Sequence, residues 1–226
     1  MRPFQKTFLL IHIILAFNNI ILAQPIPKQS IKNIINGKTW TPSLMNSENS
    51  QLFLNSLNLK GQVQMQSTIY QNVILGYDLE QDEILATIKT RNNTKRIIAL
   101  NKSELEEFKF SKAGQDFHFK RGDLIHENLN ENTYYQVTIT NGLVYVIHRK
   151  LIKILRQKTS KYTFKSANNI YIIQKGLIHP IRNRRDLLKI YTNNSSEIKK
   201  FIQQNKLKIN PKHPMDIIPV VLKYDS

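Results

Sequence analysis

The chain has no cysteine among its 226 residues. It can therefore form no disulfide, no thiolate metal site and no cysteine nucleophile. A protein without these elements has to be held together by a hydrophobic core, and apolar residues make up 41% of the sequence, which is enough to supply one. The length suits one sizeable domain or two small ones.

Glycine is scarce, with seven residues, and the glycine-rich motifs of several enzyme classes are missing. The phosphate-binding loops G-x-x-x-x-G-K and G-x-G-x-x-G do not occur, and neither does the nucleophile elbow G-x-S-x-G. We therefore expect no nucleotide site, no cofactor and no serine nucleophile of the elbow type.

Long apolar runs are confined to the beginning of the chain. Arg2 and Lys6 precede an apolar stretch that ends in the small residue Ala23. This order predicts a secretory signal peptide over residues 1–23. No later run approaches the roughly 20 apolar residues of a membrane span. We expect an exported protein, periplasmic or associated with the outer membrane, that has no transmembrane segment when mature and binds no nucleic acid.

Acidic residues are scarce in the last third of the chain. The whole sequence has 33 Lys and Arg against 16 Asp and Glu, which gives a formal net charge of +17. Residues 24–145 are nearly balanced, with 13 basic and 12 acidic side chains, whereas residues 146–226 have 18 basic and 4 acidic ones. Such asymmetry is typical of a protein that meets an anionic partner. Compositional drift toward Lys, Asn and Ile is the alternative explanation.

Short apolar runs separated by turn residues begin at Leu52 and indicate consecutive β-strands. Two alternating pairs, Phe108/Phe110 and Phe117/Phe119, predict a hairpin with four phenylalanines on one buried face.

A second hairpin is predicted around Asn141-Gly142, the preferred centre of a two-residue type I′ turn. In that register Val137 faces Val146 and Tyr135 faces His148, so we expect this side of the hairpin to meet the core.

The C-terminal section is predicted to be helical. Ile198, Phe201 and Ile202 form an apolar stripe on an expected amphipathic helix over residues 195–206, with Asn194 as its cap. The sequence thus predicts an α+β protein, mainly antiparallel β, with one twisted or partly rolled sheet of hairpins and a short C-terminal helix. Its expected parts are a signal peptide (1–23), an extended lead-in (24–50), an antiparallel β domain (51–180) and a basic, partly helical region packed on it (181–226).

Several segments together resemble a family of secreted proteins from Bacteroidetes-type bacteria. The sequence Y-Q-N-V-I-L-G-Y-D over Tyr70–Asp78 and D-E-I-L over Asp82–Leu85 are similar to the family's Y-x-N-V-x-L-x-Y-D and D-E-L motifs. The segments Tyr134–Gly142, Tyr162–Phe164 and Glu197–Ile202 fit the same family. The resemblance implies a β-rich fold in the cell envelope. It implies no activity and no catalytic residue.

The best candidate site is an anion-binding patch formed by five basic residues: Arg182, Arg184, Arg185, Lys175 and Lys189. Arginine forks hold phosphate or carboxylate with two hydrogen bonds each, and clustering favours such contacts. A solvated basic face without a ligand is the alternative. The expected partner is an anionic envelope component: a lipid head group, a polysaccharide or an acidic protein, with peripheral membrane contact included.

Two acidic or histidine-containing segments are weaker candidates. The carboxylates of Asp78–Glu83 alternate as in calcium loops, but the segment lacks the glycine and the final bidentate glutamate of such a loop. The second segment has residue types that bind metals, but their spacing matches no known ligand motif. These residues are Asp116, His118, Asp123, His126 and Glu127. We therefore expect a non-catalytic binding module. The alternative is a secreted, glycosidase-like hydrolase that uses carboxylates from distant strands.

Overall fold

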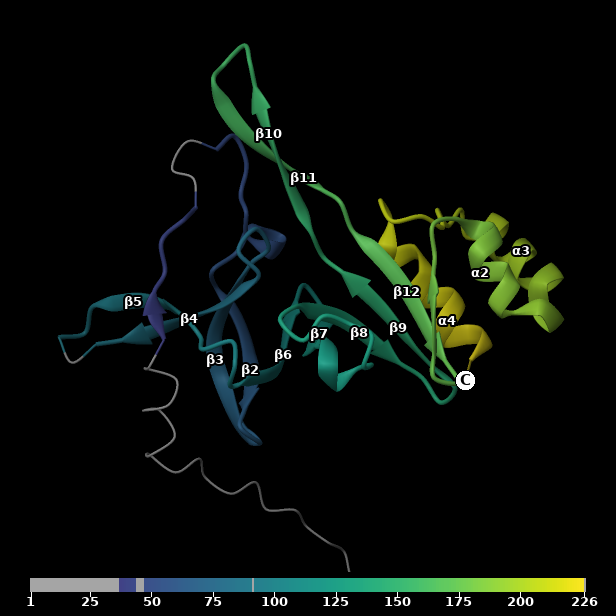
Figure 1. The fold of residues 1–226 in the computed structure, drawn as a ribbon, viewed down its shortest axis with the longest axis horizontal. Coiled ribbons are helices and arrows are strands. Elements are labelled where there is room, and N and C mark those ends of the chain that lie inside the picture. The colour runs from purple at the N-terminus through teal and green to yellow at the C-terminus, as the bar shows by residue number, and fades with distance from the viewer. Residues whose placement is uncertain (1–36, 44–46, 91, 226) are drawn as a thin grey trace, which may run out of the picture.

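The structure is a computed structural model that describes residues 37–43, 47–90 and 92–225 (Figure 1). The predicted signal peptide and the first part of the predicted lead-in lie outside the described residues. The described chain forms a mainly antiparallel sheet followed by short C-terminal helices, so the predicted α+β class is confirmed.

Eleven of the described strands form one open antiparallel sheet, in the order β1-β5-β4-β3-β2-β6-β7-β8-β9-β12-β13. In chain order these strands are β1 (Lys38–Thr39), β2 (Leu59–Met65), β3 (Thr68–Asp78), β4 (Glu83–Lys89), β5 (Lys95–Ala99), β6 (Leu105–Lys112), β7 (Gln115–Arg121), β8 (Tyr134–Ile139), β9 (Leu143–His148), β12 (Asn169–Gln174) and β13 (Leu177–Pro180). Most neighbours in the sheet are also neighbours in sequence, as expected for a set of hairpins.

The first half of the sheet encloses an aromatic core. Phe108 pairs with Phe119 and Phe110 with Phe117 across β6 and β7, as predicted. The rings of Phe108 and Phe119 stack with centroids 4.7 Å apart and planes 6° apart. Phe53, from the short 3-10 helix η2 (Phe53–Asn55), packs edge-on against Phe119 and completes this core.

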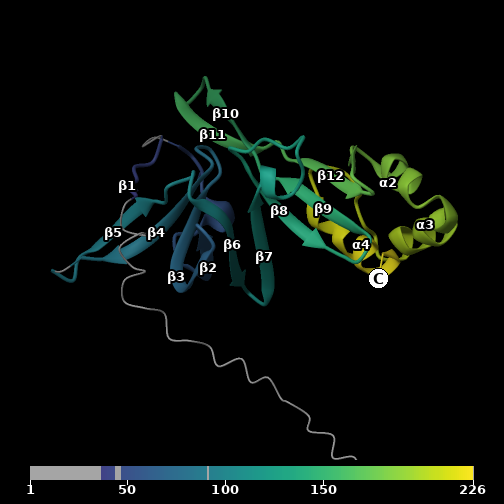
Figure 2. The same ribbon diagram turned by 60° about the horizontal axis from the view of Figure 1, so that its bottom comes forward.

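The second half of the sheet is covered on one face by the C-terminal helices (Figures 1 and 2). These helices are α2 (Arg184–Ile190), α3 (Ser195–Gln204) and α4 (Ile218–Tyr224), with the 3-10 helices η4 (Thr192–Asn194) and η5 (Pro214–Ile217) between them. Ile198 and Ile202 of α3 are buried and Phe201 is half-buried, so the predicted apolar stripe does face the core. Tyr145 and Ile147 of β9 lie on the helix-covered face of the sheet.

Strands β8 and β9 are buried on both faces. The predicted register is confirmed, with Val137 opposite Val146, and the rings of Tyr135 and His148 lie 5.1 Å apart. This side of the hairpin forms a smaller core beneath Leu129 and Ile173, whereas the helices cover the opposite side. The 3-10 helix η3 (Gly122–Leu124) precedes the loop that contributes Leu129.

The prediction of a type I′ turn at Asn141-Gly142 is wrong. Such a turn requires a positive φ at both central residues, and neither residue has one. The turn is instead stabilised from outside: the Asp225 carboxylate accepts hydrogen bonds from the Thr140 hydroxyl and, at 3.1 Å, from the Gly142 N–H. Positive φ at both central positions occurs at Ala113-Gly114, between β6 and β7.

The remaining two described strands, β10 (Leu151–Arg156) and β11 (Lys161–Ser166), form a separate antiparallel ladder. They continue the β9 and β12 strands away from the sheet and project from the body as an arm (Figures 1 and 2). We call residues 150–166 the arm. Because the arm lies between β9 and β12 in sequence, these two strands pair with each other across an insertion.

The described part of the lead-in runs along the sheet edge and the arm. Trp40 donates a hydrogen bond from Nε1 to Asp78 Oδ2 at 2.9 Å, which holds this segment against β3. Asn49 binds the arm through both polar atoms of its amide: Nδ2 donates to the Phe164 carbonyl and Oδ1 accepts from the Phe164 N–H, each at 2.7 Å.

Candidate functional site

Three of the predicted anion-binding residues lie at the start of α2. Asn183 caps this helix, because its side chain accepts hydrogen bonds from the N–H groups of Arg185 and Asp186. Arg182 turns back onto the helix, and its Nε donates to Asp186 Oδ2 at 3.1 Å. The main-chain N–H of Arg182 also donates to this carboxylate, and these bonds lower the pKa of Asp186. The positive charge of Arg182 is therefore partly compensated by Asp186.

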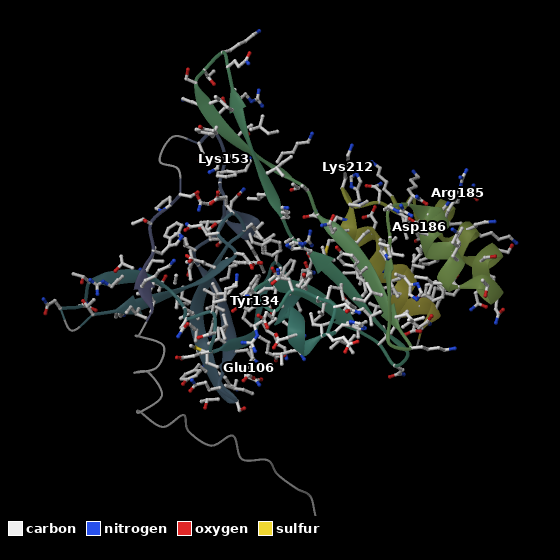
Figure 3. All side chains as sticks on the ribbon, in the orientation of Figure 1. Glu106, Tyr134, Lys153, Arg185, Asp186 and Lys212 are labelled. Carbon is white, nitrogen blue, oxygen red and sulfur yellow. The ribbon has the colours of Figure 1, made fainter. Side chains whose placement is uncertain are left out.

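Arg184, Arg185 and Lys189 are exposed and have no ion-pair partner among the described residues. Arg185 and Lys189 are separated by four positions and therefore share one face of the helix, where two like charges repel. In Figure 3 the side chain of Arg185 points away from the sheet. This end of α2 has the exposed, unpaired positive charge that an anion site requires.

Lys175 does not lie near these arginines. It stands in the turn between β12 and β13, where Gln174 pairs with Leu177. The arginines follow the other end of β13, at which Tyr171 pairs with Pro180. The two ends are separated by the length of the strand, so the predicted five-residue patch is divided.

The arm is a second basic surface, which the sequence pattern does not predict. It contains six Lys and Arg and no Asp or Glu, and the basic residues are Lys150, Lys153, Arg156, Lys158, Lys161 and Lys165. Two of them form ion pairs with the rest of the chain: Lys153 with Glu80 at 3.1 Å and Arg156 with Glu48 at 3.2 Å. Its charge density could be counted from the sequence, but its projection from the body is a tertiary feature.

Together these surfaces leave a large positive charge uncompensated. Of the 18 Lys and Arg after residue 145, three form ion pairs within the described residues: Lys153, Arg156 and Arg182. Arg149 is half-buried, and the other 14 are exposed. In the balanced part of the chain, by contrast, Glu107 alone contacts three basic side chains, those of Lys109, His118 and Lys120.

A pocket of about 320 Å³ is the best location for acid-base chemistry. Asp82, Glu83, Lys102 and Tyr134 line it. Burial raises the pKa of Asp82, while hydrogen bonds from Lys102 and Tyr77 oppose the shift. Perturbed carboxyl groups in pockets are frequent at active sites.

The contacts in this pocket favour a structural role for Asp82. Its Oδ1 accepts from the Tyr77 hydroxyl at 2.6 Å, and its Oδ2 accepts from Lys102 Nζ at 2.6 Å. Both oxygens are therefore occupied by fixed donors. Glu83 pairs with Lys38 at 2.5 Å through Oε1, and its buried Oε2 has no hydrogen-bond partner among the described residues. For the hydrolase alternative, Asp82 and Glu83 are the two carboxylates that line this pocket.

A larger groove, of about 1100 Å³, opens where β7 and β8 diverge. Their ladder is limited to three residue pairs and ends at Phe119 and Gln136. The groove is lined by Lys60, Lys109, Asp116 and His118 together with uncharged polar and apolar residues. Because both signs of charge are present, it does not extend the basic surface.

The acidic segment Asp78–Glu83 does not form a calcium site. The Asp78 carboxylate is buried and accepts from the side chains of Trp40, Gln51 and Gln81. Its Oδ1 also accepts from the main-chain N–H groups of Glu80 and Gln81, each at 3.0 Å. These donors leave no carboxylate oxygen for a cation.

The histidine-containing set is dispersed. His118 contacts Glu107 at 3.0 Å, Asp123 pairs with Arg121 at 2.7 Å, and His126 contacts the carbonyl of Gly176 at 3.0 Å. Among the described residues no group of three or more His, Asp or Glu side chains is placed to hold a metal ion.

Comparison with protein-family models, with curated proteins and with solved structures found no match to this chain. Across the described residues, each helix is too short or too polar to span a bilayer.

Proposed function

We propose that this chain is an exported, non-catalytic protein of the cell envelope whose basic C-terminal third binds an anionic partner. The observation that supports the proposal is the excess of exposed Lys and Arg after residue 145, of which 14 have no ion-pair partner among the described residues. The signal-peptide pattern and the family resemblance support the envelope location.

The exposed positive charge favours binding to an anionic surface in two ways. Clustered like charges destabilise a folded protein by mutual repulsion, and an anionic surface relieves that repulsion while it attracts the protein. Most of the exposed cations lie on the arm and along the helical region from α2 to α4, with Lys175 in the turn between β12 and β13. The arm has no acidic residue, and the helical region has four, so both surfaces keep an excess of positive charge. Lipid head groups, acidic polysaccharides and acidic proteins all present the required negative charge.

The proposal is tested by binding to three anionic probes: vesicles containing phosphatidylglycerol, dextran sulfate and poly-glutamate. We expect the purified protein to bind at about 20 mM NaCl and to be released at about 500 mM, because salt screens exposed charges. Replacement of Arg182, Arg184 and Arg185 by glutamine should weaken binding by up to about 100-fold, since each cation near an anionic surface contributes about 1 kcal/mol.

A matched variant replaces three exposed cations of the balanced part, Lys89, Lys95 and Arg96, by glutamine. It removes the same charge, and we expect it to bind nearly as the unchanged protein does. The proposal is wrong if the unchanged protein binds none of the three probes at low salt, or if both triple variants lose binding equally.

A further inference from the structure

The arm exposes an unusual amount of apolar surface. Ile152, Ile154 and Leu155 have exposed fractions of 42%, 39% and 53%. These three are among eight large hydrophobic residues that are exposed in the described chain, and they lie within four consecutive positions. Ile152 and Ile154 share one face of β10, whereas Leu155 lies on the other face. Single exposed apolar residues are normal, but neighbouring ones on one face indicate a contact surface.

The register of the arm places the isoleucines beside lysines. Ile152 is paired with Lys165 and Ile154 with Thr163, and Arg156 with Lys161. Directly paired residues point to the same side of a two-stranded ladder, and side chains two positions apart do too. One face of the arm therefore combines two isoleucines with Lys161, Lys165 and Arg156, and the arm has no acidic residue.

The lead-in reaches the isoleucine face at Arg156, which pairs with Glu48, and at Thr163, whose hydroxyl donates to Asn49. The other contacts of the arm lie away from that face. Phe164 is buried on the opposite face, and Lys153, on that same face, pairs with Glu80. The outer edge of β11 is occupied by the lead-in, in which Glu48 donates from its N–H to the Tyr162 carbonyl at 2.8 Å. The face with the isoleucines is thus presented on a fixed support, and Figure 2 shows the arm standing clear of the sheet.

Aliphatic side chains next to lysines match the chemistry of an anionic bilayer surface. The isoleucines can enter the boundary between head groups and acyl chains, while the lysine stems lie along apolar surface and their ammonium groups reach the phosphates. Single-stranded nucleic acid is bound instead by aromatic stacking platforms, and the residues that protrude here are aliphatic.

We propose that the arm is the membrane-contacting element of this protein and that its isoleucine face inserts into the surface of a bilayer rich in anionic lipid. This proposal rests on the proposed function, since it names a lipid bilayer as the anionic partner. It adds a hydrophobic contribution, which dextran sulfate and poly-glutamate do not provide.

The test compares vesicles of phosphatidylcholine with and without about 30% phosphatidylglycerol. The double variant I152S/I154S should bind the anionic vesicles at least about 10-fold more weakly, because two buried aliphatic side chains are lost from the bound state. Its binding to dextran sulfate should be unchanged, since its charge is. The matched control I69S/L124S removes two residues of similar exposure, 47% and 43%, outside the arm and should bind like the unchanged protein.

A second measurement does not depend on loss of binding. The variant I154W places an indole on the inserting face, and we expect its emission to shift to shorter wavelength on addition of anionic vesicles. Circular dichroism confirms that each variant is folded.

The outcomes separate the two proposals. If the protein binds anionic probes but I152S/I154S binds vesicles normally, or the I154W emission does not shift, the arm is not the inserting element and only electrostatic docking stands. Preference for single-stranded DNA over vesicles would likewise overturn the arm proposal. If the protein binds none of the anionic probes, the proposed function itself is contradicted.

Discussion

Arg149 shows how one residue connects the two halves of the sheet. Its Nε and Nη2 both donate to Gln136 Oε1, at 2.9 and 2.7 Å, and its guanidinium lies over the Phe53 ring at 5.4 Å. No carboxylate among the described residues pairs with it. Burial lowers the pKa of Arg149 to about 10, so it stays protonated at neutral pH.

Gln136 is therefore the oxygen acceptor on which a half-buried cation depends, and Met215 Sδ, 2.9 Å from Nη2, is a weaker second acceptor. We expect Gln136→Met to lower the free energy of unfolding by about 1–3 kcal/mol, because the guanidinium loses its oxygen acceptor. The double variant Q136M/R149M should recover most of this loss, since both polar partners are then removed together. Urea denaturation of the four proteins of this cycle measures the coupling. Additive effects would show that the contact contributes nothing.

At the scale of elements, the two candidate helix caps behave differently. Asn194 was predicted to cap α3, but its side chain makes no capping hydrogen bond. The 3-10 turn η4 already leads into α3, and the N–H of Asn194 donates to the Tyr191 carbonyl at 3.1 Å. Asn183 is the side chain that does cap a helix, with its Oδ1 at 2.8 Å from the N–H of Arg185.

We expect Asn183→Ala to destabilise the protein by about 1 kcal/mol, the usual value for a lost cap. Asn194→Ala removes the same amide from an exposed position and should change stability by less than about 0.5 kcal/mol. Thermal and urea unfolding measure both. Equal effects would mean that the Asn183 cap is not maintained in solution.

At the scale of the whole molecule, the unbalanced charge should oppose folding. Raising NaCl from about 10 to about 150 mM shortens the Debye length from about 30 to about 8 Å. Screening of the repulsion should then raise Tm by a few degrees, about 2–4 °C for each kcal/mol gained. The variant K158Q/K161Q/K165Q, which removes three exposed charges of the arm, should show a smaller rise. A Tm that falls with added salt would contradict this explanation.

The hairpins were predictable because they depend on local information. Alternation at Phe108–Phe119 and the two-residue loop Asn141-Gly142 determine which residues face each other, since side chains in a strand alternate between two faces. The turn type at Asn141-Gly142 was not predictable, because Asp225, more than 80 positions away, supplies its hydrogen bonds.

The candidate surfaces were only partly predictable for a related reason. Composition revealed the basic last third, and Arg184 and Arg185 do lie together on exposed helix. The separation of Lys175 from them follows from the direction of β13, and the exposure of Ile152 and Ile154 follows from the arm leaving the sheet. Burial depends on what packs against a strand, and alternation alone does not reveal it.

The sequence by itself determined the absence of disulfides, the pairing within hairpins, the amphipathic helix around Ile198 and the unequal division of charge, because each depends on residue type or on close neighbours along the chain. Only the tertiary structure decided the order of strands, the pairing of β9 with β12 across the arm, and which apolar side chains remain exposed. Those properties arise from contacts between distant segments, whose free energies no local pattern encodes.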